Sequence, residues 1–210
     1  TTDVNLSRVY EAITCYLGWN INEAGKTMGL APYGKFNSNF PPFFNKNTGN
    51  PNVFYRDQSE EKNNPRGQST FIDEDLNHQL KLKKNPKEWH YDESKITDLE
   101  KDLAWRVQND TQQIVGDYIE KSIRETGLKQ VCCAGGYFLN CVTNYYLKKR
   151  FPDVEFYFEP IANDAGTAIG AAKLLWHEET QDTTIRPFKS LYLGKQYSKK
   201  KLLKGIKKYT

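Results

Sequence analysis

The sequence predicts an α/β fold interrupted by a long irregular insertion. Residues 96–177 alternate between helical apolar spacing and short apolar runs typical of strands. A Gly-Gly pair and a Pro-containing turn join the two strand runs to the helices that follow them. The chain has 210 residues, 38% of them hydrophobic, which is enough for a core and for one domain or slightly more.

The first expected element is a helix from about residue 5 to residue 17, which Gly18 can end. Its apolar stripe consists of Leu6, Val9, Tyr10, Ile13 and Leu17. A compact segment punctuated by glycines follows at residues 23–34, with the sequence EAGKTMGLAPYG.

Residues 35–95 differ in kind, because they are rich in Asn, Pro, Lys and Gln and show no periodicity. About 60 residues is too long for an ordinary loop, so we interpret this segment as an insertion with short strands near 52–55 and 70–73. Its scattered aromatic anchors are Phe40, Phe43, Phe44, Phe54, Tyr55 and Phe71.

From Ile96 the pattern predicts a long helix that Gly127 ends. Its stripe is Leu99, Leu103, Val107, Ile114, Tyr118 and Ile119. The remaining expected elements are a buried strand at 130–134, the Gly135-Gly136 turn, a helix at 139–151, a strand at 154–158, a turn at 160–163 and a helix at 164–177.

The charge is distributed unevenly along the chain. The formal net charge is +4, yet the segment from Lys189 to the end holds eight lysines and no acidic residue, so the preceding residues carry −4. Such a tail could bind RNA or an anionic membrane, but a solvated helix face is the simpler interpretation, and we expect neither a nucleic-acid nor a membrane partner.

The cysteines and the ends of the chain indicate its environment. None of the four cysteines forms a C-x-x-C pair, so reduced thiols are expected, with Cys132 and Cys133 acting as small hydrophobes in an apolar run. The chain contains neither a leader nor an apolar run of about 18 residues, which favours a cytoplasmic protein. Because it starts at Thr1 and holds a single Met, we expect a piece of a longer chain.

Three segments could carry chemistry. Gly135 and Gly136 allow close backbone approach, and the helix after them favours an anion, although a tight structural turn explains the pair equally well. Asp164, at a strand-to-helix junction, could bind a metal or cap its own helix. Lys26 could pair with a phosphate or be one more solvated lysine.

No set of side chains indicates a hydrolase triad, so no catalytic residue is assigned. The three histidines, His78, His90 and His177, are expected to have surface or packing roles.

Four ordered motifs resemble the NodU/CmcH carbamoyltransferase family. They are the Gly25–Gly34 segment, the 103–108 helix sequence LAWRVQ, the 134–141 sequence AGGYFLNC and the 163–172 sequence NDAGTAIGAA. The segment 190–198, SLYLGKQYS, is similar to the start of the family's C-terminal domain. The resemblance covers most of the chain outside the insertion.

The resemblance implies an incomplete actin/sugar-kinase-like (ribonuclease H-like) subdomain. Residues 1–186 would form the later part of the N-terminal carbamoyl-transfer domain, and residues 187–210 the start of an adenylate-forming domain. Family members use ATP and carbamoyl phosphate to make a carbamoyl-adenylate and pass the carbamoyl group to a hydroxyl of a sugar or other small molecule. The remainder of the full-length chain would be needed, so we expect residues 1–210 to be inactive alone.

By motif match, Gly135, Gly136 and Asn140 correspond to the loop near the phosphates, with Lys26 as a further binding candidate. Asp164 corresponds to the ligand of a divalent metal, iron in this family. The chain departs from the family in its bulky Tyr137-Phe138-Leu139 and in Asn163, which replaces a common Gly. A relative of the tRNA threonylcarbamoyl-transferases, a kinase-like enzyme and a non-catalytic relative remain alternatives.

Overall fold

The computed structural model describes residues 6–40, 42–45, 96–184, 190–192 and 194–209, without the side chains of Cys15 and Ile21. It divides the chain into two units, residues 1–167 and 168–210, which are described separately. The expected strands near 52–55 and 70–73, together with Phe54, Tyr55, Phe71, His78 and His90, lie outside the described residues.

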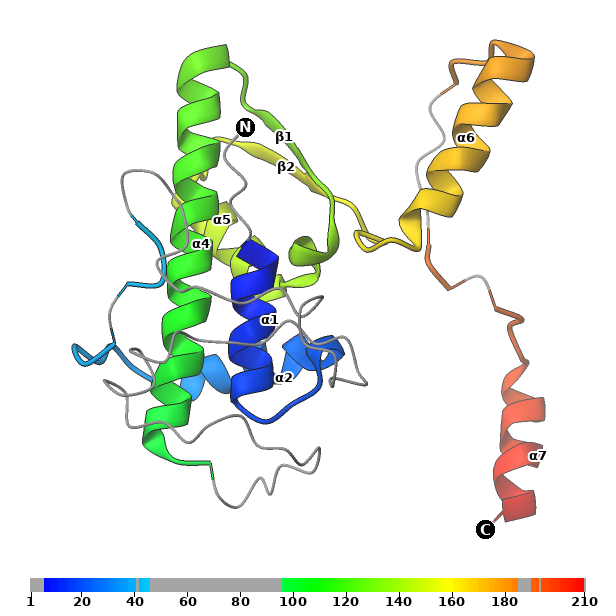
Figure 1. Cartoon of the computed structure of the whole chain (residues 1–210). Helices are drawn as coiled ribbons and strands as arrows, with labels where there is room; N and C mark the ends of the chain where they lie inside the picture. The colour runs from blue at the N-terminus through cyan, green and yellow to red at the C-terminus, as the bar shows by residue number, and fades with distance from the viewer. Residues whose placement is uncertain (1–5, 41, 46–95, 185–189, 193, 210) are drawn as a thin grey trace, which may run out of the picture. The chain divides into compact units, whose positions relative to one another are not determined.

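The first unit is built around two helices, α1 (Leu6–Tyr16) and α4 (Asp98–Thr126), which lie side by side (Figure 1). A short helix, α2 (Ala24–Leu30), and two single turns, η1 (Ile21–Glu23) and η2 (Ala31–Tyr33), pack beside them. The predicted stops hold, because Gly18 and Gly127 both have positive φ. At the start of α4, Glu100 accepts a hydrogen bond from the backbone of Thr97, which closes the first turn.

The main hydrophobic core lies between α1, α4 and the segment that follows α2. The predicted stripe is buried at Leu103, Val107 and Ile114, but Tyr118 is exposed, so its assignment to the buried face is wrong. Of the predicted aromatic anchors, Phe40, Phe43 and Phe44 are buried. The core members are Val9, Tyr10, Ile13, Leu17, Trp19, Ala31, Phe40, Phe43, Phe44, Leu103, Ala104, Val107 and Ile114.

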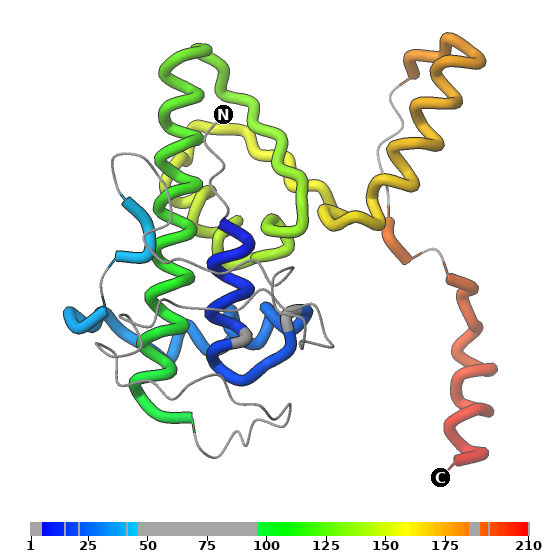
Figure 2. Tube along the Cα trace, in the orientation of Figure 1, coloured from blue at the N-terminus to red at the C-terminus, as the bar shows by residue number. Residues whose placement is uncertain are grey.

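The second half of this unit is a strand–helix–strand segment. The chain passes from β1 (Gln130–Cys133) through a short turn of helix, η5 (Gly136–Leu139), and α5 (Cys141–Arg150) to β2 (Glu155–Phe158) (Figure 2). The two strands pair in parallel, with Cys133 opposite Phe158. The expected helix at 139–151 therefore begins later than predicted, because Asn140 caps α5 and Leu139 belongs to the preceding turn.

The sheet buries one face only. Side chains alternate along a strand, so Cys133 faces the core while Cys132 and Tyr157 are exposed on the opposite face. The prediction of a fully buried strand at 130–134 is thus wrong for its outer face, and only Cys133 behaves as a buried hydrophobe. Burial, with a smaller contribution from Cys132, raises the pKa of Cys133 to about 11.

The end of α5 is tied to α4 by one arginine. Arg150 donates to Asp117 Oδ1 at 2.7 Å and to Glu120 Oε2 at 2.6 Å. A second nitrogen of the same guanidinium donates to the Tyr146 hydroxyl at 3.2 Å. Gly116 leaves room for this side chain, since a Cβ there would collide with it.

The remaining helices are α6 (Gly166–Thr180), which crosses from the first unit into the second, and α7 (Lys199–Tyr209). His177 is exposed near the end of α6 and lies 3.3 Å from the backbone oxygen of Asp182, as its predicted surface role requires. On α7, exposed lysines occupy one face, and Leu202, Leu203 and Ile206 occupy the other. Among the described residues, no helix combines the length and the apolar character that crossing a membrane requires.

Candidate functional site

The candidate site lies where the two parallel strands end. Because β1 and β2 run in the same direction, the turns that follow them leave the same edge of the sheet. The backbone N–H of Glu159 extends the pairing by donating to the Cys133 carbonyl at 2.9 Å. The turn that holds Gly135 and the turn that holds Asp164 therefore start from adjacent points, which is the arrangement typical of ligand sites in α/β sheets.

The two glycines of the first turn serve different purposes. Gly135 has φ 98° and ψ 150°, a conformation that side-chain-bearing residues rarely adopt, so the turn itself requires glycine there. Gly136 has no positive φ, and a Cβ built on it would meet nothing within 4 Å. Nothing in the described part of the chain explains why position 136 is a glycine, whereas a ligand lying against its backbone would.

The turn also presents unused hydrogen-bond donors. Both glycines are exposed, and their backbone N–H groups donate to no acceptor within the described residues. The carbonyl of Gly135 accepts from the Phe138 N–H at 2.9 Å, so these two amides lie at the start of the 3₁₀ turn. Adjacent free amides of this kind form the donor set that phosphate oxygens accept from.

Asn140 is used within the protein. Its Oδ1 accepts from the Thr143 N–H at 3.0 Å, which caps α5, and its Nδ2 donates to Gln108 Oε1 at 2.8 Å. The side chain therefore holds the end of the loop in place and already has partners for both of its polar atoms.

Asp164 does not cap its helix. The helix α6 begins at Gly166, and the side chain that closes the turn is that of Asn163, which accepts from the Ala165 N–H at 3.2 Å. The backbone carbonyl of Asp164 accepts from Thr167, but within the described residues its carboxylate forms no hydrogen bond and is exposed. Of the two interpretations from the sequence, the capping one is wrong in this structure, and the carboxylate is available to a ligand.

The described side chains of this site are too few to bind a metal ion by themselves. Within the described residues no group of three or more His, Cys, Asp or Glu side chains could hold a metal ion. Asp164 would supply a single ligand, which is too few for a bound transition metal. The other ligands would have to come from outside the described residues.

Lys26 lies on α2, the short helix whose Met28 contacts the start of α5. The Sγ of Cys141, which follows Asn140, lies 3.9 Å from the Met28 Sδ, so the 25–34 and 134–141 motifs meet. Lys26 forms an exposed ion pair with Glu23 at 2.8 Å. The hydrogen bond from Lys26, followed by one from the Asn20 backbone, lowers the pKa of the Glu23 carboxyl. An exposed pair of this kind can open to let the ammonium reach an anion.

Two acidic residues that sequence reasoning missed attach the segment after Gly34 to α4. Asp102 on α4 is buried and accepts from the Lys35 N–H at 2.9 Å and from Asn37 Nδ2 at 3.0 Å. Asp110 accepts from the Phe43 N–H at 2.9 Å and from Arg106 at 2.8 Å. In the sequence, the signal for both residues is an acidic side chain beside the apolar stripe of α4. The periodicity of the stripe does not predict that such a side chain has buried partners.

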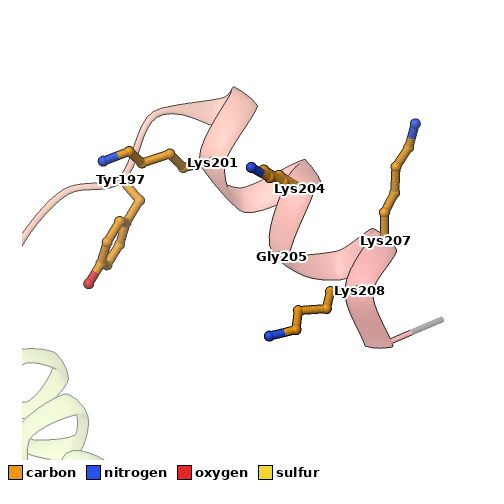
Figure 3. A pocket seen from close by; sticks show the side chains of 6 residues that line it. All are labelled: Tyr197, Lys201, Lys204, Gly205, Lys207 and Lys208. Carbon is orange, nitrogen blue, oxygen red and sulfur yellow. The ribbon is translucent and has the colours of Figure 1, made fainter.

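The second unit contains a hollow that does not resemble this site. It lies along α7 and is lined by Tyr197, Lys201, Lys204, Gly205, Lys207 and Lys208, and the side chains of the lysines extend from the helix in different directions (Figure 3). An open groove between solvated lysines is a normal feature of a basic amphipathic helix, so we assign it no ligand.

The amino-acid sequence of this chain matches a known protein family. Residues 3–173 match the family described as carbamoyltransferase N-terminus. The chain belongs to this family. The carbamoyltransferase resemblance expected from the four motifs is thereby confirmed, and both turns of the candidate site lie inside the matched region.

Relatives in several organisms are similar along nearly the whole chain. An uncharacterized protein of Synechocystis, sll1178, is 30% identical over 96% of this chain and 33% of its own length. The nodulation protein NolNO of Sinorhizobium fredii is 25% identical over 90% of this chain and 25% of its own length. An uncharacterized protein of Methanocaldococcus jannaschii, MJ1058, is 27% identical over 97% and 31% respectively. The chain thus spans a third or less of these relatives.

Proposed function

We propose that the protein carrying this chain is a carbamoyltransferase that passes a carbamoyl group from carbamoyl phosphate, through a carbamoyl-adenylate made with ATP, to a hydroxyl of a small-molecule or sugar acceptor. Membership of the carbamoyltransferase N-terminus family supports this proposal. We further propose that the first unit is part of an actin/sugar-kinase-like domain, of which the β1–α5–β2 segment is the portion described.

One observation of the structure carries the assignment of the site. The exposed Gly135-Gly136 turn leaves the same sheet edge as the turn that bears Asp164, and within the described residues neither the two glycine amides nor the Asp164 carboxylate forms a hydrogen bond. Phosphate and carbamoyl oxygens accept hydrogen bonds, and the amides of Gly135 and Gly136 would donate them. The Asp164 carboxylate would lie beside the same ligand, where it can accept from an N–H or O–H group.

Within this proposal, the chain's own residues bind and orient the substrate. The positive φ of Gly135 shapes the turn, and the absence of a Cβ at Gly136 would let a phosphate approach the backbone. Lys26, on the neighbouring α2, would add a positive charge near the bound anion after releasing Glu23. No residue of the chain is assigned to proton transfer.

The test is the change Gly136→Val in the protein that carries this chain. Position 136 has room for a side chain and no backbone strain, so we expect an unchanged thermal melt. A ligand lying against the Gly136 backbone would collide with the new side chain, and we expect the affinity for ATP or carbamoyl phosphate to fall by about tenfold or more.

The comparison variant is Gly135→Ala, which places a Cβ at a positive φ and should lower the melting temperature. A Gly136→Val protein that melts normally and binds both ligands with wild-type affinity would refute the site. Calorimetric titration with each ligand, beside a thermal melt of each variant, provides these values.

A further inference from the structure

A buried side-chain amide on α4 lies behind the glycine turn. Gln108 is 4% exposed and faces α1 and the start of α5. Its Oε1 accepts from the Tyr10 hydroxyl at 2.9 Å and from Asn140 Nδ2 at 2.8 Å. Its Nε2 donates to the Thr143 hydroxyl oxygen at 3.1 Å and to Gln112 Oε1 at 3.3 Å. One amide therefore joins α1, α4 and the cap of α5.

The orientation of these amides follows from the backbone. The Thr143 N–H can only donate, so the atom of Asn140 that receives it must be the oxygen. The other terminal atom of Asn140 is then the nitrogen, which needs an acceptor, and Gln108 supplies its Oε1. The nitrogen of Gln108 consequently points to Thr143, and each polar group in the cluster has a partner of the right kind.

The loop between Gly135 and Asn140 is attached to the same cluster. The Tyr137 hydroxyl lies 3.2 Å from Thr143 Oγ1, and Asn144 Nδ2 donates to the Phe138 carbonyl at 2.8 Å. Burial raises the pKa of the Tyr137 hydroxyl, which keeps it neutral and able to donate at ordinary pH. Displacing Asn140 or Thr143 would thus move the backbone that carries the two glycines.

We propose that Gln108 is a positioning residue for the Gly135-Gly136 turn: by holding Asn140 and Thr143 against α4, it fixes the direction in which the free amides of the turn point. It does not touch the ligand, because it is buried behind the loop. Its expected effect on ligand binding rests on the proposed function, whereas its effect on the loop does not.

The experiment changes Gln108→Leu in the protein that carries this chain and follows amide hydrogen exchange without any ligand. Leucine fills similar space but leaves Tyr10, Asn140 and Thr143 without their partner in a buried place. The reporting amides are those of Phe138, Asn140 and Thr143, each of which is hydrogen-bonded within this loop or cap. We expect their exchange to accelerate about tenfold.

The control is Gln113→Leu, the same substitution at an exposed position of the same helix. Gln113 also contacts α5, accepting from the Tyr146 hydroxyl at 2.8 Å, but two turns away from the cap. We expect the three reporting amides to exchange at wild-type rates in this variant. If Gln108→Leu accelerates them no more than Gln113→Leu does, the positioning role is overturned.

A second variant keeps the inference testable if Gln108→Leu does not fold. Asn140→Asp preserves the cap of α5, because aspartate accepts from the Thr143 N–H equally well, but it removes the donor to Gln108. Faster exchange at Phe138 and Asn140, with the Thr143 amide still protected, supports the inference. Wild-type exchange at all three amides overturns it.

Ligand binding separates this inference from the proposed function. We expect Gln108→Leu to raise the KM for carbamoyl phosphate or ATP more than it lowers kcat, at a temperature where the variant is fully folded, because a misdirected turn weakens ground-state binding. Faster exchange with unchanged KM would support the positioning role and contradict the turn as a substrate site.

Discussion

Gly34, the last residue of the 25–34 segment, is packed so closely that replacing it should destabilise the protein by an amount that the structure allows us to calculate. Gly34 has φ −98° and ψ 176°, which any residue can adopt, so backbone strain does not require glycine there. The requirement comes from packing. A Cβ at position 34 would overlap the backbone carbonyl of Lys101 and lie 2.8 Å from the Asp102 nitrogen, and both are fixed atoms of α4.

Gly34→Ala must therefore move the chain away from α4. The shift would separate the Lys35 N–H from Asp102 Oδ1, now 2.9 Å apart, and leave a buried carboxylate short of a donor. Overpacking costs about 1–3 kcal/mol, and a hydrogen bond to a charged group contributes about 1.5–3 kcal/mol. We expect the free energy of unfolding to fall by about 3 kcal/mol.

The assay is thermal or urea unfolding followed by circular dichroism. A loss of this size lowers the melting temperature by about 6–12 °C in a domain of 150–250 residues. Gly25→Ala is the matched control, because nothing lies within 4 Å of a Cβ there and alanine favours the helix α2. A Gly34→Ala protein that melts within a degree of the Gly25→Ala protein would refute the packing argument.

Cys133, Arg150 and Asp164 each allow an independent test of the structure. The free energy of unfolding should fall as the pH rises from about 9 to about 11, because the unfolded chain releases the Cys133 proton at a lower pH than the folded chain does. In urea titrations at several pH values, Cys133→Ala should reduce the dependence of the free energy of unfolding on pH, and an unchanged dependence would contradict the prediction. Arg150→Met should lower the free energy of unfolding, measured by urea titration, by about 1–2 kcal/mol. Lys121→Met loses only an exposed ion pair at 3.8 Å and should leave the free energy unchanged, so equal effects of the two changes would refute the stabilising role of the Arg150 contacts. If the proposed function is correct, Asp164→Asn should abolish carbamoyl transfer in the protein carrying this chain. The melting temperature should not fall, since the Asp164 side chain caps no helix within the described residues, and a fully active variant would remove Asp164 from the site.

The local sequence predicted the elements well where spacing and stop residues agree. For α4, the sequence shows an apolar stripe and then Gly127, which ends the helix in the left-handed conformation. The stripe and the stop residue therefore predict the same helix. The boundaries of α5 and α6 were less accurate. The side chains of Asn140 and Asn163 close turns just before these helices. Such a turn shifts the first residue of the helix by one or two positions, and the spacing of the apolar residues does not reveal the shift.

Burial was harder to predict than secondary structure. Cys132 belongs to an apolar run, yet it lies on the outer face of a sheet of two described strands, because alternation along a strand sends neighbours to opposite faces. Tyr118 fits the helical stripe but lies where the described residues leave it partly exposed. Which face meets the core depends on the elements packed against it, and those are far away in the sequence.

The α/β order, the helix stops and the motifs that mark the family could all be predicted from the sequence, because each depends on residues within one element or on ordered short segments. The partners of individual residues became visible in the folded arrangement alone. Asn140 acts as a cap bound to Gln108 from 32 positions away, and Gly34 faces a carbonyl 67 positions along the chain. A hydrogen bond or a close contact exists only when two groups meet in space, and the order of residues along a chain does not specify which distant groups will meet.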